Sequence, residues 1–202
     1  SAGNIVRSTN NGASWDNVTS PPPKNSLYPI TANLYGISFG NNTFVAVGYE
    51  GIIFRSTDNG ESWDNATTDN ISTTNHLIGV TFGNNTFVAV GSAGNIVRSS
   101  DNGSSFDNAT YPTINTLNGV TFGNNTFVAV GYNGNIVRST DNGSSFSTVT
   151  SPNNYYIKGV TFGNNTFVAV GNSGNIVRST NNGESWDNAT FPTSHYLYGV
   201  GF

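Results

Sequence analysis

The residues that could do acid–base or metal chemistry are few. The sequence has two histidines, His76 and His195, which occupy equivalent linkers, and neither has an evident acidic partner. All carboxylates except Glu50 and Asp69 fall in or just after one repeated segment, so no acid pair of the kind used in glycoside hydrolysis stands out. There is no cysteine, and the ligand run of a calcium-binding EF-hand loop is missing. The sequence therefore predicts a non-enzymatic protein without a metal site or a cofactor.

The charge pattern excludes two further classes of function. Charged residues make up 9% of the chain, and the formal net charge is −4. Nucleic-acid binding needs clustered basic residues, but the only lysines are Lys24 and Lys158, and every arginine occupies the same repeat position. No apolar run approaches the roughly 20 residues of a membrane-spanning helix. Because Asn, Ser, Thr and Gly dominate, we expect an extracellular or cell-surface protein without membrane insertion.

The elements that must position these residues follow from an internal repeat. The segment FGNNTFVAVG begins at Phe39, Phe82, Phe122 and Phe162, and a further copy begins at Phe202, with spacings of 43, 40, 40 and 40 residues. A second segment, N-I-V-R-S-x-[DN]-N-G-x-S-[WF], alternates with the first. Such a period is typical of repeat architectures, in which each unit buries its apolar residues against its neighbours.

One repeat contains four strand patterns separated by turns rich in Asn and Gly. In the third repeat the expected strands, named A to D, cover residues 117–122, 126–131, 135–140 and 144–150. Strand B is a nearly continuous apolar run, which indicates that both faces of the sheet are buried. A four-stranded antiparallel unit of about 40 residues matches a propeller blade. We therefore predict an all-β fold, a five-bladed β-propeller, with a β-solenoid as the alternative.

Residues 1–202 are expected to form one repeat domain whose fifth blade is split between the termini. The four complete blades are expected at residues 34–67, 77–110, 117–150 and 157–190. The fifth would combine strands C and D from residues 1–19 with strand A from residues 197–202, and it lacks strand B. Either the sequence is a window on a longer array, or another chain donates the strand and the protein self-associates.

The C–D hairpin resembles the Asp-box (BNR) motif, S-x-D-x-G-x-x-W, of sialidases and other bacterial propellers. The clearest copy runs from Ser56 to Trp63, and other copies carry Asn for Asp or Phe for Trp. The Ser hydroxyl and the Asp carboxylate can bind backbone N–H groups of their own hairpin, and the Gly supplies a positive φ. The motif residues, which we expect to be structural, are Ser8, Asn10, Gly12, Trp15, Ser56, Asp58, Gly60, Trp63, Ser99, Asp101, Gly103, Phe106, Ser139, Asp141, Gly143, Phe146, Ser179, Asn181, Gly183 and Trp186.

This resemblance implies a propeller fold but does not imply activity. Sialidase catalysis uses arginines from different blades, a Tyr–Glu nucleophile pair and an acidic residue, whereas every arginine here is a repeat-equivalent residue. The repeated segments are also similar to repeats of bacterial secreted and cell-surface proteins. They are similar, too, to a photosystem assembly factor of propeller type, and that similarity implies seven blades.

The residues that differ between repeats concentrate in the B–C turns and the D–A linkers, which emerge on one face of a propeller. Many are aromatic, and flat rings next to Asn and Ser are typical of surfaces that bind sugars or peptides. The linker aromatics could instead cap the apolar edges of the blades. The candidate binding residues are Tyr35, Tyr49, His76, Tyr111, Tyr132, Tyr155, Tyr156, His195, Tyr196 and Tyr198.

The opposite face and the outer edge carry repeated N-x-[ST] sequons, which are acceptors for N-glycosylation in an exported protein. The candidate asparagines are Asn17, Asn41, Asn65, Asn70, Asn84, Asn102, Asn108, Asn124, Asn142, Asn164 and Asn188. Two hypotheses for function remain. The first is an extracellular binding or adhesion module whose partner is a glycan or a cell-surface protein, with glycan favoured. The second is a structural subunit of a surface layer or filament assembled by strand exchange.

Overall fold

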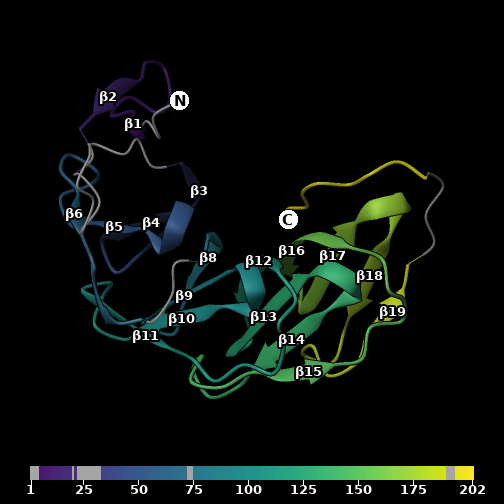
Figure 1. The fold of residues 1–202 in the computed structure, drawn as a ribbon. Helices are drawn as coiled ribbons and strands as arrows, with labels where there is room; N and C mark the ends of the chain where they lie inside the picture. The colour runs from purple at the N-terminus through teal and green to yellow at the C-terminus, as the bar shows by residue number, and fades with distance from the viewer. Residues whose placement is uncertain (1–4, 20, 22–32, 72–74, 190–193) are drawn as a thin grey trace.

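The fold is all-β, and the sheets follow one another around an arc (Figure 1). The computed structural model describes residues 5–19, 21, 33–71, 75–189 and 194–202. Four sheets contain the A-to-D antiparallel order, and one sheet has two strands. This arrangement confirms the predicted all-β propeller class. Within the described ranges, no helix has the length and apolar character needed to cross a bilayer.

Each four-stranded sheet is one blade. Blade I consists of β3 (Leu34–Gly40), β4 (Thr43–Gly48), β5 (Ile53–Ser56) and β6 (Asp64–Asn65). Blade II consists of β8 (Leu77–Gly83), β9 (Thr86–Gly91), β10 (Ile96–Ser99) and β11 (Ser105–Asn108). Blade III consists of β12 (Leu117–Gly123), β13 (Thr126–Gly131), β14 (Ile136–Ser139) and β15 (Ser147–Val149). Blade IV consists of β16 (Ile157–Gly163), β17 (Thr166–Gly171), β18 (Ile176–Ser179) and β19 (Asp187–Asn188).

The register of each blade is set by two kinds of turn. At the A–B turn of blade III, Gly123 pairs with Thr126, and the two intervening residues, Asn124 and Asn125, have φ of 46° and 56°. Two left-handed residues make the tight turn whose twist matches that of the flanking strands. The B–C turns are short 3-10 turns: η1 (Tyr49–Gly51), η2 (Ser92–Gly94), η3 (Tyr132–Gly134) and η4 (Asn172–Gly174).

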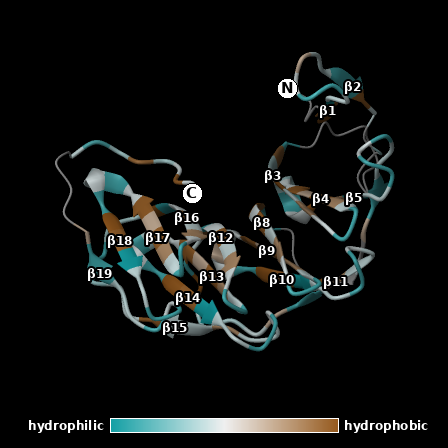
Figure 2. Ribbon diagram, turned by 180° about the vertical axis from the view of Figure 1, so that it is seen from behind, coloured by the Kyte–Doolittle hydropathy of each residue, from teal (hydrophilic) through white to brown (hydrophobic). Residues whose placement is uncertain are grey.

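The hydrophobic core lies between neighbouring blades. Alternate residues of β13 face opposite sides, so Val128 and Val130 pack on blade IV while Phe127 and Ala129 pack on blade II. Figure 2 shows the apolar residues concentrated in the middle strands and the hydrophilic ones in the turns. The sheet is therefore buried on both faces, as the continuous apolar run of strand B predicts. The innermost strands β3, β8, β12 and β16 line the concave side of the arc (Figure 1).

The two ends of the arc depart from this pattern. The two-stranded sheet of β1 (Ile5–Arg7) and β2 (Asp16–Val18) packs on blade I but leaves Ile37 and Phe39 of β3 exposed. The sequence predicts a strand A over residues 197–202, but the structure has no strand there, because each strand A pairs with strand B of its own blade and no such strand is described for this segment. The segment nevertheless runs beside β16, because a Cβ atom on Gly159 of β16 would lie 3.3 Å from the Tyr198 carbonyl oxygen. The Leu197 N–H also donates over 3.0 Å to the carbonyl of Gly171, the last residue of β17.

A further strand was not predicted. The segment after blade I, expected to be an irregular linker, contains β7 (Thr67–Asn70), which pairs in parallel with the outer strand β11 of blade II. A shorter parallel pairing follows blade II, where Thr110 forms an isolated parallel bridge with Ser145 of blade III. These pairings tie the linkers after blades I and II to the outer edge of the following blade, so that blades I to III are joined at their rims as well as through the core.

Candidate functional site

The hairpins that resemble the Asp-box are closed by their own side chains. In blade I the Ser56 hydroxyl donates to Asp58 over 2.8 Å and accepts the buried Gly60 N–H over 2.9 Å. Asp58 also accepts the Ser62 N–H, at 3.0 Å. The same contacts recur in the other blades, and in blade IV Asn181 takes the place of the aspartate and accepts the Ser185 N–H at 3.0 Å. The motif is thus a local device that holds the C–D turn.

The aromatic residue of this motif packs between blades only where a preceding blade is present. Trp63, Phe106, Phe146 and Trp186 are buried, whereas Trp15 of the two-stranded sheet is 61% exposed. The burial of four of the five aromatic residues is what a structural motif requires, and the exposed one lies at the end of the arc.

We expect Ser139→Ala to lower the free energy of unfolding by about 1–3 kcal/mol, because the buried Gly143 N–H would lose its acceptor. Chemical denaturation measures this change. Ser144→Ala, an exposed serine of the same hairpin, is the matched control and should be close to neutral. Equal stability of the two variants would contradict the role assigned to the Ser139 hydroxyl.

The hairpin carboxylates also make stability depend on pH. Hydrogen bonds from the Ser62 hydroxyl and N–H and from the Ser56 hydroxyl lower the pKa of Asp58. At Asp101 and Asp141 burial acts in the opposite direction, but the serine hydroxyl and N–H donors outweigh it, and the pKa of each is lowered. A carboxyl whose pKa is lower in the folded than in the unfolded state stabilises the fold above its unfolded pKa.

This stabilisation should be lost as the pH falls from about 4, near the pKa of an unfolded aspartate, through the lower folded-state values. The triple variant D58N/D101N/D141N should fold, because Asn10 and Asn181 already occupy the same position in other hairpins. Its stability should fall less between pH 5 and pH 3 than that of the unaltered chain. Melting curves at a series of pH values test this, and parallel profiles for the two proteins would refute it.

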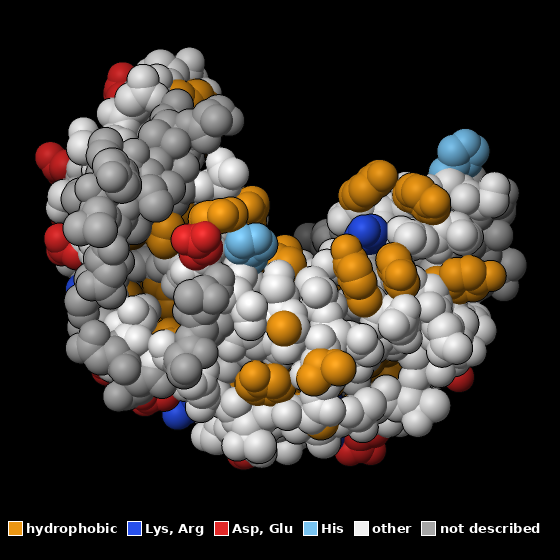
Figure 3. All heavy atoms as spheres, in the orientation of Figure 1, with side chains coloured by type: hydrophobic (Ala, Val, Ile, Leu, Met, Phe, Trp, Pro, Cys, Tyr) orange, Lys and Arg blue, Asp and Glu red, His pale blue; other side chains and the backbone are white. Residues whose placement is uncertain are grey.

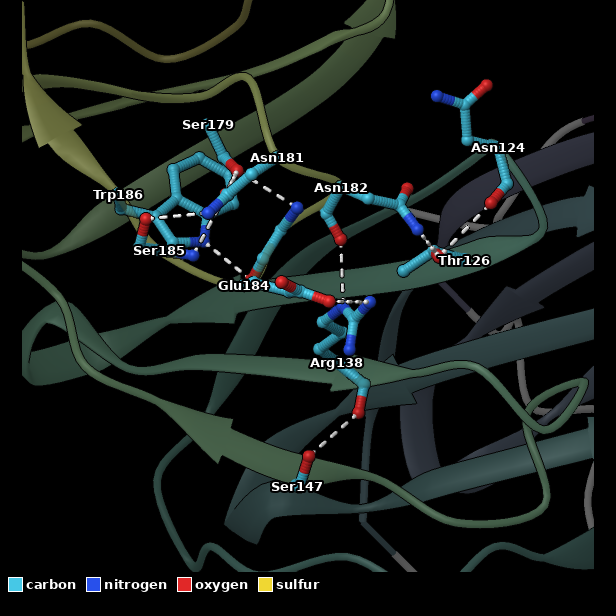
Figure 4. A network of polar contacts seen from close by, with 11 residues as sticks. Asn124, Thr126, Arg138, Ser147, Ser179, Asn181, Asn182, Glu184, Ser185 and Trp186 are labelled. Carbon is cyan, nitrogen blue, oxygen red and sulfur yellow. Dashed lines mark hydrogen bonds and ion pairs between the residues drawn. The ribbon is translucent and has the colours of Figure 1, made fainter.

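The arginines and the hairpin asparagines join neighbouring blades. The Arg138 Nε atom of blade III donates to the Asn182 carbonyl of blade IV over 2.8 Å, and an Arg138 guanidinium nitrogen lies 3.4 Å from Glu184 (Figure 4). In return, the Asn182 side chain donates to the Thr126 hydroxyl over 2.7 Å. Arg55 repeats the first contact with the Asn102 carbonyl. These arginines therefore serve the scaffold and are not gathered around a substrate position.

Shallow grooves on the rim belong to the same scaffold. One groove is lined by Arg138, Thr148, Glu184 and Trp186, among others. A second is lined by the repeat-equivalent residues Arg7, Asn17, Glu61 and Trp63. Because equivalent positions of the repeat line both grooves, the grooves are a consequence of blade packing. Among the described residues, no group of three or more His, Cys, Asp or Glu is placed to hold a metal ion.

The B–C turns lie at the end of the blades opposite to the C–D hairpins. We call this end the variable face. There, each B–C turn meets the linker that enters the next blade. In blade I the Glu50 N–H donates to His76 Nδ1 over 3.0 Å, and the Tyr49 ring stacks on the His76 ring with centroids 4.6 Å apart. The Tyr35 ring meets the same imidazole edge-on at 6.1 Å. A hydrogen bond to Glu50 and its negative charge raise the pKa of Tyr49. We call these four residues, Tyr35, Tyr49, Glu50 and His76, the acidic cluster.

The second cluster lies between blades III and IV. The Tyr132 and Tyr156 rings are parallel to within 3°, with centroids 4.5 Å apart, and each residue is 38% exposed. The Lys158 Nζ atom lies 5.7 Å from the centre of the Tyr132 ring. We call Tyr132, Tyr156 and Lys158 the basic cluster. Figure 3 shows two groups of hydrophobic side chains on this face, one beside a histidine and an acidic side chain and one around a basic side chain.

The structure does not bring all ten candidate residues together. Tyr196 and Tyr198, whose rings meet edge-on at 6.5 Å, extend the row beyond blade IV. The His195 carbonyl accepts the Gly174 N–H over 2.7 Å, which fixes this linker on the B–C turn of blade IV. Tyr111 and Tyr155 are exposed but make no ring contact among the described residues. Between the two clusters, the B–C turn of blade II carries only Ser92 and Ala93 in place of an aromatic residue.

Sequence reasoning left Lys158, Glu50 and Asn118 out of the candidate set. Lys158 and Asn118 precede the strand A glycine, at the position that also holds Tyr35 and Tyr198. The Asn118 side chain donates to the Ile157 carbonyl of the neighbouring inner strand over 2.7 Å. The sequence signal that could have identified Lys158 is the variation between repeats at this position, where Lys158 is the only positively charged residue.

The candidate glycosylation sites fall into three groups. Asn41, Asn84, Asn124 and Asn164 lie at the A–B turns, at the opposite end of the blades from the variable face. Asn17, Asn65, Asn108 and Asn188 lie on the outermost strands, and the Asn70 side chain lies outside the described part. The side chains of Asn102 and Asn142 donate to Thr43 and Thr86 of the preceding blade, so a glycan there would displace an inter-blade hydrogen bond.

No protein-family model matches the chain, and no curated protein sequence matches it. Solved structures match over most of its length. A structure of YCF48 bound to a D1 peptide has a TM-score of 0.68 at 18% identity and covers 94% of this chain. YCF48 from Cyanidioschyzon merolae has a TM-score of 0.66 at 18% identity, over 87% of this chain. An ancestral GH74 enzyme has a TM-score of 0.75 at 17% identity, over 98% of this chain.

These similarities establish the fold. The chain is a β-propeller. It spans 61% of the peptide-bound YCF48 chain, 62% of the Cyanidioschyzon merolae protein and 30% of the GH74 enzyme. The matches include both an enzyme and a protein that holds a peptide, so the propeller's function has to be argued from its own side chains.

Proposed function

We propose that this propeller is a non-enzymatic binding module, located outside the cell or on its surface, whose variable face recognises carbohydrate. The observation that carries the proposal is the parallel Tyr132–Tyr156 pair, which places partly exposed flat rings at a junction of two blades. Aromatic rings give a large contact area at little conformational cost, because each has only two side-chain torsions to fix. Tyrosines near amides suit a ligand with both apolar ring faces and hydroxyls.

The distribution of carboxylates favours binding over catalysis. Asp58, Asp101 and Asp141 accept hydrogen bonds inside their own hairpins, at the end of the blades away from the variable face. We propose that these hairpins are Asp-boxes in the structural sense. Glu50 lies on the variable face, but no other described carboxylate contacts it to form an acid–base pair. The tyrosines thus have the geometry of a contact surface, without the paired acids of a glycosidase.

A protein ligand is the second candidate, and one observation favours it: YCF48, whose fold this chain shares, is known in a structure with a bound peptide. The same tyrosines could pack on an extended peptide, as they do in many protein interfaces. The two ligand classes differ in whether free sugars compete for the surface.

A glycan microarray probed with the fluorescently labelled chain tests the proposal. We expect reproducible binding to a subset of glycans, and we expect the corresponding free oligosaccharide to compete for it. Binding to cells that survives enzymatic removal of their glycans, together with an empty array, would reject carbohydrate and favour a protein partner.

A further inference from the structure

One cation lies on the variable face without a carboxylate partner. Lys158 is the only lysine in the described ranges, and no described Asp or Glu lies within ion-pair distance of it. Its stem is half-buried on β16, and its Nζ atom is near the Tyr132 ring. The ring quadrupole stabilises the ammonium but does not neutralise it. The basic cluster therefore carries an uncompensated positive charge on a protein whose net charge is −4.

The residues around Lys158 supply groups that a bound ligand would contact. On one side, the Asn118 amide donates to the Ile157 carbonyl next to Lys158. On the other side, the Tyr198 backbone runs beside Gly159, and Tyr198 is 71% exposed. The Tyr132 ring lies near the Lys158 Nζ atom and stacks on the Tyr156 ring. A cation, an amide and flat rings thus converge within one blade junction.

We infer that this junction is a subsite for an acidic sugar, with the sugar carboxylate on the Lys158 ammonium and the sugar ring against the tyrosines. The inference rests on the proposed function and adds the charge of the ligand to it. A hydrogen bond between two charged groups is stronger than one between neutral groups, so Lys158 would select for the carboxylate. The acidic cluster repels the same group through Glu50, which confines the anionic end of the ligand to the blade III–IV side.

Binding of an oligogalacturonate and of its carboxyl-reduced counterpart, measured by calorimetry, tests this inference, with sialyllactose and lactose as a second pair. Lys158→Asn is a suitable variant because Asn118 already occupies the equivalent position. It should weaken binding of one or both charged sugars about tenfold and leave the uncharged sugar of the pair unchanged. Lys158→Arg should restore the preference for the charged sugar.

Ser104→Glu is the matched control, because it lowers the net charge by one at a hairpin position where Glu61 and Glu184 stand in other repeats. It should not change binding. Equal affinity for charged and uncharged sugars, or equal losses in Lys158→Asn and Ser104→Glu, would overturn the inference while the carbohydrate function stands. Absence of binding to any sugar, with Lys158-dependent binding to a poly-glutamate peptide, would overturn both.

Discussion

Replacing Gly131 by alanine should destabilise the propeller by about 3 kcal/mol, near the upper end of what overpacking usually costs. A Cβ atom on Gly131 would lie 2.0 Å from the Thr116 carbonyl oxygen. That oxygen belongs to the backbone and already accepts the Tyr132 N–H over 3.0 Å. Because it cannot retreat without breaking this hydrogen bond, the B–C turn and the entry into strand A would both have to shift.

Gly119→Ala is the matched control within the same blade. A Cβ atom there would lie 3.6 Å from its nearest neighbours, at ordinary van der Waals distance. Urea denaturation of the two variants gives the comparison. If Gly131→Ala were as stable as Gly119→Ala, the close approach between strand B and the linker would not be a real constraint on this fold.

The second large effect concerns binding. Tyr132→Ala and Tyr156→Ala should each weaken glycan binding about tenfold or more, because aromatic anchors dominate the energy of such surfaces. Since the two rings stack on each other, either truncation also removes the support of the other. The double variant should therefore lose less affinity than the sum of the single variants. Titration of each protein with the best array glycan measures this.

Tyr132→Phe and Asn124→Gly serve as controls. The phenylalanine keeps the ring and loses the hydroxyl, so it separates stacking from hydrogen bonding. Asn124 lies at the far end of blade III with φ of 46°, a conformation that glycine accepts, and its replacement should leave affinity unchanged. Equal losses of affinity in Asn124→Gly and Tyr156→Ala would mean that the face has been assigned wrongly.

The blades were predictable because their signals are local. The Asn124–Asn125 turn, the apolar run of strand B and the Asp141 hairpin each depend on residues within a few positions of one another. The ends of the arc were less predictable, since pairing of residues 197–202 requires a strand that no local pattern supplies. The parallel pairing of β7 was missed because its partner, β11, lies in the next blade.

The candidate site was predicted as a set of positions but not as an arrangement. Variation between repeats indicates that Tyr132 and Tyr156 lie on one face. That their rings stack, while Tyr111 and Tyr155 have no ring partner among the described residues, depends on the rotation between blades and on linker length. Lys158 was overlooked because a single basic residue has no local pattern. Lys158 becomes a candidate binding residue only when the structure shows the Tyr132 ring of the preceding blade near its Nζ atom and no described carboxylate beside it.

The paired left-handed asparagines of the A–B turns have a kinetic consequence. Four A–B turns adopt this conformation, at Asn41–Asn42, Asn84–Asn85, Asn124–Asn125 and Asn164–Asn165. The chain therefore contains four copies of one turn that can nucleate a β-hairpin. Hairpins of this kind close in about 1–10 μs. Four equivalent nuclei can therefore form independently and in any order, and the slow step of folding becomes the docking of finished blades. The identical hairpins could also exchange partners along the chain, and the non-identical linkers would then have to restore the correct order.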